Sequence, residues 1–219
     1  VMTAVSALRG SIESGLSFLG SNMFQFSKYP AISSGGSAAA KYRNRRDITY
    51  QECERYRQLM RDYTDVICVK VFNQGVVQAF YQTRHSNPGL TFAGTDQYFL
   101  TANQYTIAYG RNLTAEDIAF ARPVIVIGKS IQDNLFPNES PLGKRIRVNT
   151  GVYTIVGVLA EKGTVFGQSQ DDVLIVPITR YLADFGSQGR TMNIATQAPA
   201  QQLYNETLDR AITAMRIVR

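Results

Sequence analysis

The sequence PVIVIGKSIQDNLFP, residues 123–137, is the clearest local signal in this chain of 219 residues. Its first part, Val124–Ile127, is a β-branched run that ends at Gly128, which is typical of a buried strand. Residues 130–136 have room for about two helical turns, and Pro137 then stops the helix. The stretch therefore predicts a buried strand followed by a short helix.

A hairpin is predicted directly after this stretch. Lys144–Val148 alternates polar and apolar residues, so Ile146 and Val148 share one face of a strand. The next three residues, Asn-Thr-Gly, suit a three-residue hairpin loop in which Gly151 adopts positive φ. The return strand is YTIVGVL at residues 153–159.

The two ends of the chain have a similar rhythm, and the middle differs from both. Residues 1–74 and 171–219 alternate helices and strands, whereas residues 75–170 carry short strands and turns at close spacing. We expect an α+β fold in which both ends form one β-α-β layered unit and residues 75–170 form a second, strand-rich unit inserted into it. A strand of the first segment should then pair with Val173–Val176 or Met192–Thr196.

Helix signals are clearest at two places. Thr49–Glu52 has the capping-box pattern, in which the Thr49 hydroxyl accepts the amide of residue 52 and the Glu52 carboxylate accepts the amide of residue 49. Thr114–Asp117 carries a weaker version of this signal. An apolar stripe at spacings of three and four predicts a helix at the N-terminus and consists of Val5, Leu8, Ile12, Leu16 and Leu19.

The chain is basic, with a formal net charge of +6 and a pI near 9.4. Its densest basic cluster is Lys41, Arg43, Arg45 and Arg46, which follows a Ser- and Gly-rich run and is predicted to be a solvated loop. A nucleic-acid site would need basic residues on ordered elements together with stacking aromatics, so we expect no nucleic-acid partner.

We expect no membrane-spanning or leader segment within this sequence. No apolar run approaches the roughly 20 residues that a bilayer crossing needs. The start, Val1-Met2-Thr3, lacks the charged and apolar regions of a secretory leader. We therefore expect a water-soluble part of a longer protein.

No catalytic, cofactor or metal site is predicted. His85, the one histidine, stands in a turn and lacks the companions of a two-histidine metal site or a Ser-His-Asp arrangement. Asp171 and Asp172 lack a calcium-loop pattern and are predicted to lie in a solvated turn. Gly128-Lys129-Ser130 lacks the upstream glycine of a phosphate-binding loop.

Cys53 and Cys68 lie on a predicted helix and on the strand after it. Neighbouring elements could bring them together, but the sequence does not show the geometry of a bridge. We favour two buried thiols over a disulfide.

One loop carries the candidate contact site. Val165 and Phe166 are apolar residues in a segment bounded by Gly163 and Gly167, and an exposed apolar pair on a loop can mark a protein contact. The alternative is that Phe166 folds back onto its own subdomain.

Segments along most of the chain resemble, in the same order, the extracytoplasmic core domain of MacB/FtsX-type ABC transporter permeases. They are LGSNMF (19–24), GTDQYF (94–99), YGRNLTAED (109–117), the strand–helix–hairpin region 123–148 with its LFP and PLGKRI sequences, YTIVGVL (153–159) and VLIVP (173–177). The resemblance identifies the outer unit, 1–74 and 171–219, with the family's Porter layer and the inserted unit, 75–170, with its Sabre subdomain.

This resemblance also implies a function without catalysis. It places the domain at the extracytoplasmic (periplasmic) face of the bacterial inner membrane, between transmembrane helices that both end helices approach. Two such subunits would transmit an ATP-driven conformational change for the export of a peptide, drug, lipid or lipoprotein, with hinges near Gly75 and Gln170. The implied partners are a second permease subunit and a periplasmic adaptor or lipoprotein-type protein.

Two other functions stay open. An FtsX-like domain would activate a cell-wall hydrolase by contact and differs in its partner rather than its fold. A secreted hydrolase is disfavoured because the sequence has no recognisable nucleophile-base-acid arrangement.

Overall fold

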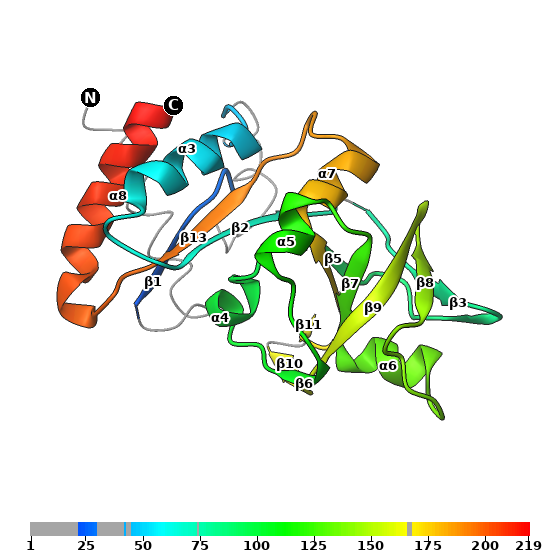
Figure 1. Ribbon diagram of the computed structural model, residues 1–219. Helices are drawn as coiled ribbons and strands as arrows, with labels where there is room; N and C mark the ends of the chain where they lie inside the picture. Colours follow the sequence, from blue (N-terminus) through cyan, green and yellow to red (C-terminus); the bar gives the residue numbers. More distant parts are fainter. Residues whose placement is uncertain (1–21, 30–41, 43–44, 74, 166–167) are drawn as a thin grey trace. The chain divides into compact units, whose positions relative to one another are not determined.

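The structure is a computed structural model that describes residues 22–29, 42, 45–73, 75–165 and 168–219. It is a mixed α+β fold that divides into two compact units (Figure 1). The first unit comprises Val1–Val69, Thr101–Gln104 and Ser187–Arg219, and the second comprises Lys70–Leu100 and Tyr105–Gly186. The helix predicted at residues 5–19 lies outside the described residues.

The first unit is built from both ends of the chain. Its elements are β1 (Met23–Phe26), α3 (Tyr50–Met60), the first half of β2 (Ile67–Phe72), β13 (Asn193–Gln197), a 3-10 turn (Gln201–Leu203) and α8 (Tyr204–Val218). β1 pairs antiparallel with β13 from Met23–Gln197 to Phe26–Ile194, which confirms the predicted long-range pairing with the segment 192–196. α3 and α8 pack against each other.

Aromatic contacts fix the two helices on β1. The Phe24 ring lies 5.8 Å from that of Tyr204 on α8, and the Phe26 ring lies 5.9 Å from that of Tyr56 on α3. The Tyr56 hydroxyl, buried in this layer, lies 2.9 Å from the Thr196 hydroxyl on β13. The β-α-β layer is therefore closed by contacts between residues far apart in the sequence.

The capping box at the start of α3 is confirmed. The Glu52 amide donates to the Thr49 hydroxyl at 3.2 Å, and the Thr49 amide donates to the Glu52 carboxylate at 2.8 Å. Leu59 on this helix and Tyr63 after its end are 42% and 38% exposed. The buried stripe follows Cys53, Tyr56 and Met60, whose spacings of three and four keep them on one side of the helix.

The second unit is dominated by strands. They are the second half of β2, β3 (Ala79–Tyr81), β4 (Arg84–His85), β5 (Thr91–Thr95), β6 (Ile107–Gly110), β7 (Val124–Ile127), β8 (Arg145–Val148), β9 (Gly151–Leu159) and β12 (Val173–Pro177). Their order is β2-β5-β12-β7-β9-β8-β3-β4, with β6 on β9. A separate small hairpin joins β10 (Thr164–Val165) and β11 (Gln168–Ser169). The helices are α5 (Ala115–Ala119), α6 (Lys129–Leu135) and α7 (Ile178–Phe185), while α4 (Phe99–Asn103) contributes residues to both units.

The strand, helix and hairpin predicted from residues 123–159 are present as β7, α6 and β8–β9. The loop differs from the prediction, because Val148 pairs with Gly151 and leaves only two residues between the strands. The positive φ falls on Asn149, at 51°, and not on Gly151. Gly151 instead makes room for a ring, since an added Cβ would lie 2.3 Å from the Tyr153 hydroxyl.

The boundary between the units differs from the predicted one at its C-terminal side. β12 and α7, within the segment 171–186, belong to the second unit and not to the layer formed by the chain ends. β12 is buried along its whole length and needs a neighbour on each edge, which it finds in β5 (parallel) and β7 (antiparallel). The alternation of helices and strands in the sequence could not reveal this boundary, because it does not specify which strands pair.

The core of the second unit explains why α7 belongs there. The Phe92 ring on β5 lies 5.4 Å from that of Tyr181 and 5.7 Å from that of Phe185, both on α7. At Gly94 an added Cβ would lie 2.4 Å from the Cβ of Tyr181. Glycine at this position therefore lets α7 approach the backbone of β5 closely.

Candidate functional site

The side chains with potential chemistry serve structural roles. Among the described residues there is no group of three or more His, Cys, Asp or Glu side chains that could hold a metal ion. The Asp171 carboxylate accepts the amides of Lys162 at 2.7 Å and Gly163 at 2.9 Å, and Asp172 accepts a hydrogen bond from Ser130. These acids close turns that are half-buried rather than fully solvated.

The segment Gly128–Ser130 packs against β12 and forms no phosphate-binding loop. The Gly128 amide donates to the Val173 carbonyl at 2.8 Å, and an added Cβ would lie 2.1 Å from the Asp171 carbonyl oxygen. Lys129 forms an ion pair with Asp133 within α6. The glycine is needed for close packing between the two segments.

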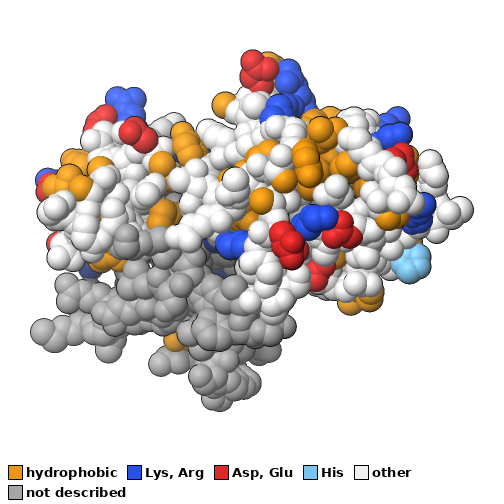
Figure 2. Space-filling view, turned by 90° about the horizontal axis from the view of Figure 1, so that it is seen from below, with side chains coloured by type: hydrophobic (Ala, Val, Ile, Leu, Met, Phe, Trp, Pro, Cys, Tyr) orange, Lys and Arg blue, Asp and Glu red, His pale blue; other side chains and the backbone are white. Residues whose placement is uncertain are grey.

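His85 lies on the surface of the second unit, where it is exposed (Figure 2). Its Nδ1 is 3.1 Å from the Gln78 amide nitrogen. The surface position was expected, but His85 lies in β4, where it pairs with Phe80, and not in a turn.

The loop that carries the candidate contact residues is anchored at its base. Val165 pairs with Gln168 in the β10–β11 hairpin, and Phe166 lies outside the described residues. The Lys162 ammonium lies 4.2 Å from the centre of the Tyr105 ring, and the Tyr105 hydroxyl donates to the Gln170 carbonyl at 3.1 Å. Burial, with a smaller contribution from Asp171, raises the pKa of Tyr105 to about 12. The role of Val165 and Phe166 in a partner contact stays a prediction.

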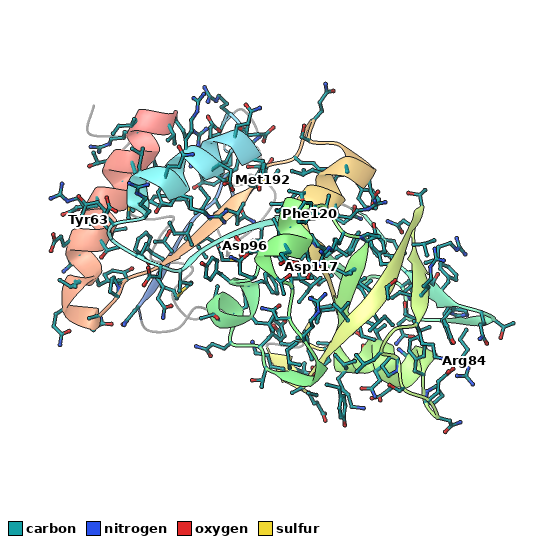
Figure 3. All side chains as sticks on the ribbon, in the orientation of Figure 1. Tyr63, Arg84, Asp96, Asp117, Phe120 and Met192 are labelled. Atoms are coloured by element: carbon teal, nitrogen blue, oxygen red, sulfur yellow. The ribbon has the colours of Figure 1, made fainter. Side chains whose placement is uncertain are left out.

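A buried ion pair organises the corner between β6 and α5. Figure 3 labels Asp117 on α5, and its side chain is fully shielded from solvent. Arg111 donates to it through Nη1 at 2.6 Å and Nη2 at 3.3 Å, and the Thr114 amide donates at 3.0 Å. Burial alone would raise the pKa of Asp117, but the hydrogen bonds from Arg111 and Thr114 outweigh it and hold the pKa below its usual range.

Two glycines allow the backbone to close around this corner. Gly110 has a φ of +77°, and an added Cβ would lie 2.3 Å from the Val156 carbonyl oxygen. At Gly157 an added Cβ would lie 2.2 Å from the Arg111 carbonyl oxygen. The capping pattern predicts Asp117 at a helix start but does not indicate Arg111 as its partner, although the two residues are only six positions apart.

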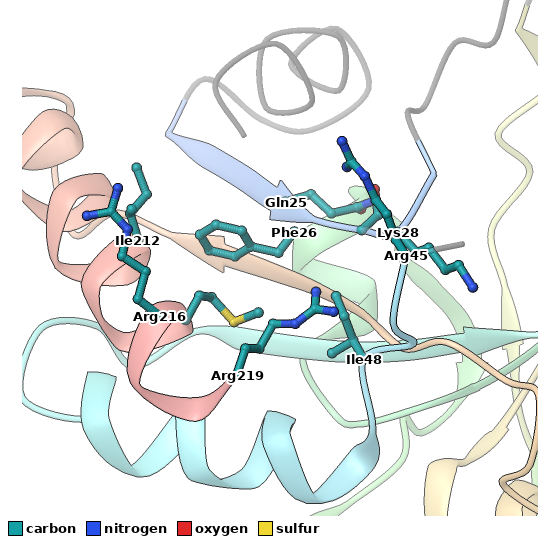
Figure 4. Close-up of a pocket in the computed structure, with 10 residues that line it drawn as sticks. Gln25, Phe26, Lys28, Arg45, Ile48, Ile212, Arg216 and Arg219 are labelled. Atoms are coloured by element: carbon teal, nitrogen blue, oxygen red, sulfur yellow. The ribbon is translucent and has the colours of Figure 1, made fainter. Parts of the chain in front are cut away.

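A pocket of about 270 Å³ lies in the first unit, between β1, the chain before α3 and the end of α8 (Figure 4). Its apolar side chains belong to residues that are otherwise buried, at 1–8% exposure: Phe26, Ile48, Ile212 and Met215. Its cationic side chains are Lys28, Arg45, Arg216 and Arg219, and Gln25 and Ser27 complete the lining. The pocket therefore combines an apolar floor with a basic rim.

Only part of the positive charge around the pocket is paired. Lys28 lies 2.8 Å from Asp47, and this hydrogen bond raises the pKa of Lys28. Arg46 forms an ion pair with Glu52. The ion pairs between described residues include none with Arg45, Arg216 or Arg219.

The arginines come from segments far apart in the sequence. Arg219 donates to the Arg46 carbonyl at 2.6 Å across 173 residues, and the Arg45 guanidinium stacks 4.4 Å from the centre of the Tyr42 ring. The sequence predicts only a solvated loop at Arg45 and Arg46. The available signal was the spacing of three residues between Arg216 in the last turn of α8 and Arg219 directly after the helix.

The family model described as the MacB-like periplasmic core domain matches residues 1–213. This chain belongs to that family. The resemblance found in the sequence is therefore confirmed, and the MacB-like domain lies on the extracytoplasmic side of the membrane. None of its described helices has the length and apolar character required for a bilayer crossing.

Curated relatives of the MacB-like domain are much longer proteins. The "Macrolide export ATP-binding/permease protein MacB" of Rhodopirellula baltica is 36% identical over 132 residues, which cover 58% of this chain and 19% of the relative. The protein of the same name from Chlorobium phaeobacteroides is 24% identical over 183 residues, covering 82% of this chain and 26% of the relative. The chain thus spans about a quarter or less of these relatives.

Solved structures show the same fold. The periplasmic region of MacB from Actinobacillus actinomycetemcomitans aligns with a TM-score of 0.68 at 16% identity, covering 91% of this chain and 86% of that one. The extracellular domain of the ABC-type transporter YknZ from Gram-positive bacteria aligns with a TM-score of 0.64 at 18% identity, covering 78% and 83%. The fold of the MacB-like domain is therefore that of an ABC permease extracytoplasmic domain.

Proposed function

We propose that this MacB-like domain is a non-catalytic transmitter of an ABC transporter permease. The observation that carries the proposal is the family match over residues 1–213, which covers both compact units. ATP hydrolysis in a separate cytoplasmic part of the transporter would move the domain, and two copies would carry that motion to the exported molecule. The cargo class is a peptide, drug, lipid or lipoprotein.

The connectivity of the two units suits such a role. We retain the division into a unit formed by the chain ends, the Porter-like layer, and an inserted Sabre-like unit. The chain crosses between them at Val69–Lys70 and Gly186–Ser187, and briefly returns to the first unit at Thr101–Gln104. β2 contributes to both, because Lys70–Phe72 pairs with β5 in the second unit while the start of β2 belongs to the first. Packed units of this kind move as rigid bodies, and the connecting residues absorb the change.

The proposed setting is the periplasmic face of the bacterial inner membrane, with transmembrane helices flanking the domain. A second permease subunit would supply the other copy. A periplasmic adaptor or a lipoprotein-type protein would receive the motion, and Val165 and Phe166 are the proposed contact residues.

The test uses the complete permease that carries this domain, reconstituted in liposomes. Replacing residues 22–219 with a flexible Gly-Ser linker should abolish export while ATP hydrolysis stays within about a factor of two, since the domain takes no part in the chemistry. The matched control is Arg61→Gln, at an exposed position outside the pocket and the buried corner, which should export normally.

Retained export in the linker variant would refute the proposal, as would ATP hydrolysis by the purified 219-residue chain. If the variant still exports but no longer activates a cell-wall hydrolase, the FtsX-like function replaces the transmitter role.

A further inference from the structure

We propose that the pocket between β1 and α8 binds a single acidic phospholipid. Its phosphate would lie among Arg45, Arg216 and Arg219, and the first part of its acyl region would lie on the apolar floor. This inference rests on the pocket alone and does not depend on the transmitter function.

The apolar floor is the first argument for an amphiphile. Phe26 from β1, Ile48 from the chain before α3, and Ile212 from α8 line one hollow (Figure 4). A free inorganic anion would leave this apolar surface in contact with water, whereas a hydrocarbon segment would cover it at a gain of about 25 cal/mol per Å² buried. The site therefore favours a ligand with an apolar part.

The basic rim is the second argument and sets the sign of the headgroup. Arg45, Arg216 and Arg219 line the same pocket, and no acidic side chain among the described residues pairs with them. Like charges around one pocket repel one another. Burial lowers the pKa of Arg219, the charges of Arg46 and Arg45 lower it further, and Asp47 partly offsets these effects. The net direction agrees with repulsion between the arginines. An anion among the three guanidinium groups would remove it.

The chemistry of the rim suits an anion with several oxygens, such as a phosphate. Guanidinium groups donate as planar forks that match phosphate oxygens, and these come from two separate segments, before α3 and at the end of α8. A zwitterionic lipid would bring its own ammonium group against the same arginines. An acidic headgroup such as phosphatidylglycerol carries no such cation.

The volume limits how much of the ligand the pocket holds. At about 270 Å³ it is slightly smaller than ordinary small-molecule sites, which begin near 300 Å³. It can accept a headgroup and the beginning of a chain, but not a whole lipid. The remainder of the ligand would extend out of the pocket.

The test measures binding of soluble short-chain lipids to the 219-residue chain by titration calorimetry. The probe is dihexanoyl phosphatidylglycerol below its micelle concentration. Three comparison ligands are dihexanoyl phosphatidylcholine, glycerol phosphate and hexanoate. We expect phosphatidylglycerol to bind at least ten-fold more tightly than any of the three.

Charge-matched variants separate the pocket from the overall charge of the chain. The double variant Arg216→Gln, Arg219→Gln should weaken binding at least ten-fold. Arg61→Gln, Arg210→Gln removes the same charge at exposed positions outside the pocket and should bind as the unmodified chain does. Arg45→Gln, from the other segment, should also weaken binding, and thermal melts establish that every variant is folded.

Each contrary result overturns the proposal in its own way. Equal binding of phosphatidylcholine would reduce the site to an apolar hollow, and equal binding of glycerol phosphate would make it a free-anion site. Equal binding of hexanoate would make it a site for soluble fatty acids. An equal loss in the control double variant would attribute binding to net charge.

Discussion

Arg111 holds the fully buried carboxylate of Asp117 with both terminal nitrogens, at 2.6 and 3.3 Å. The same carboxylate caps α5 through the Thr114 amide. The Asp117 side chain therefore caps the start of α5. It also forms an ion pair with Arg111, which is about half exposed, and so holds the chain that follows β6 in place. The short motif GRNLTAED is explained by these contacts.

Asp117→Asn should destabilise the second unit by about 2–3 kcal/mol, because it removes charged hydrogen bonds to a buried group. Urea denaturation at pH 7 measures the change. Asp133→Asn is the matched control, since Asp133 is an exposed partner of Lys129 and should cost no more than about 0.5 kcal/mol. Equal effects of the two substitutions would contradict a special role for Asp117.

The same residue predicts a dependence of stability on pH. The pKa of Asp117 in the folded chain lies below its unfolded value, which is about 3.9. Its contribution is therefore complete above that unfolded value and is lost as the pH falls through the folded pKa. We expect the stability difference between the unmodified chain and Asp117→Asn to shrink between pH 5 and the acid limit of folding. If the difference grows on acidification, the pKa of Asp117 is not lowered by folding and this prediction is wrong.

Gly157→Ala should destabilise the same corner by about 2–3 kcal/mol, because overpacking forces the backbone to shift. The added Cβ would lie 2.2 Å from the Arg111 carbonyl oxygen. Gly143→Ala is the comparison, since Gly143 has a φ of +75° but nothing within 4 Å of an added Cβ. Gly143→Ala should lower the free energy of unfolding only through backbone strain, by about 1–2 kcal/mol. A smaller loss at Gly157 than at Gly143 would refute the steric explanation.

Local patterns predicted the elements that depend on neighbouring residues. The β-branched run Val124–Ile127 and the alternation in Lys144–Val148 formed strands as expected, and the Thr49 capping box formed because its two partners are three residues apart. The predicted positive φ at Gly151 is wrong, because it falls on Asn149 instead. Glycine is needed at position 151 because a side chain there would clash with the Tyr153 ring, and this contact depends on packing.

Features that join distant segments could not be predicted in the same way. The parallel pairing of β12 with β5 joins Val173 to Thr91, and nothing in the sequence of β12 specifies that neighbour. The basic pocket likewise needs Arg45 and Arg219 to meet, across most of the chain. Charge and hydropathy patterns describe one element at a time, whereas these sites arise only when elements pack.

Thr49→Ala should destabilise the first unit by about 1 kcal/mol, the usual cost of losing an N-cap. The Glu52 amide loses its acceptor at 3.2 Å, and the reciprocal bond from the Thr49 amide loses its fixed geometry. Thermal unfolding followed by circular dichroism measures the shift. Thr49→Ser keeps the hydroxyl and should stay close to the unmodified chain. If both variants shift equally, the lost methyl group and not the cap is responsible.

Cys53 and Cys68 should be unreactive until the first unit opens. Both are thiols with 0% exposure, Cys53 on α3 and Cys68 on β2, so the preference for buried thiols over a disulfide is confirmed. A disulfide reagent must reach the thiol to react with it, and burial denies that access. Ellman's reagent should therefore titrate no thiol in the folded chain and two after denaturation in guanidinium.

The rate of this reaction then reports how the layer opens. Because Tyr56 ties α3 to Thr196 on β13, α3 should leave the strands only when that layer unfolds, and both thiols should react with one rate constant set by opening. Tyr56→Phe removes the hydrogen bond and should speed the reaction of both thiols to the same extent. A Cys53 that reacts well before Cys68 would show that α3 detaches while the strands stay paired, and the proposed cooperativity of the layer would then be wrong.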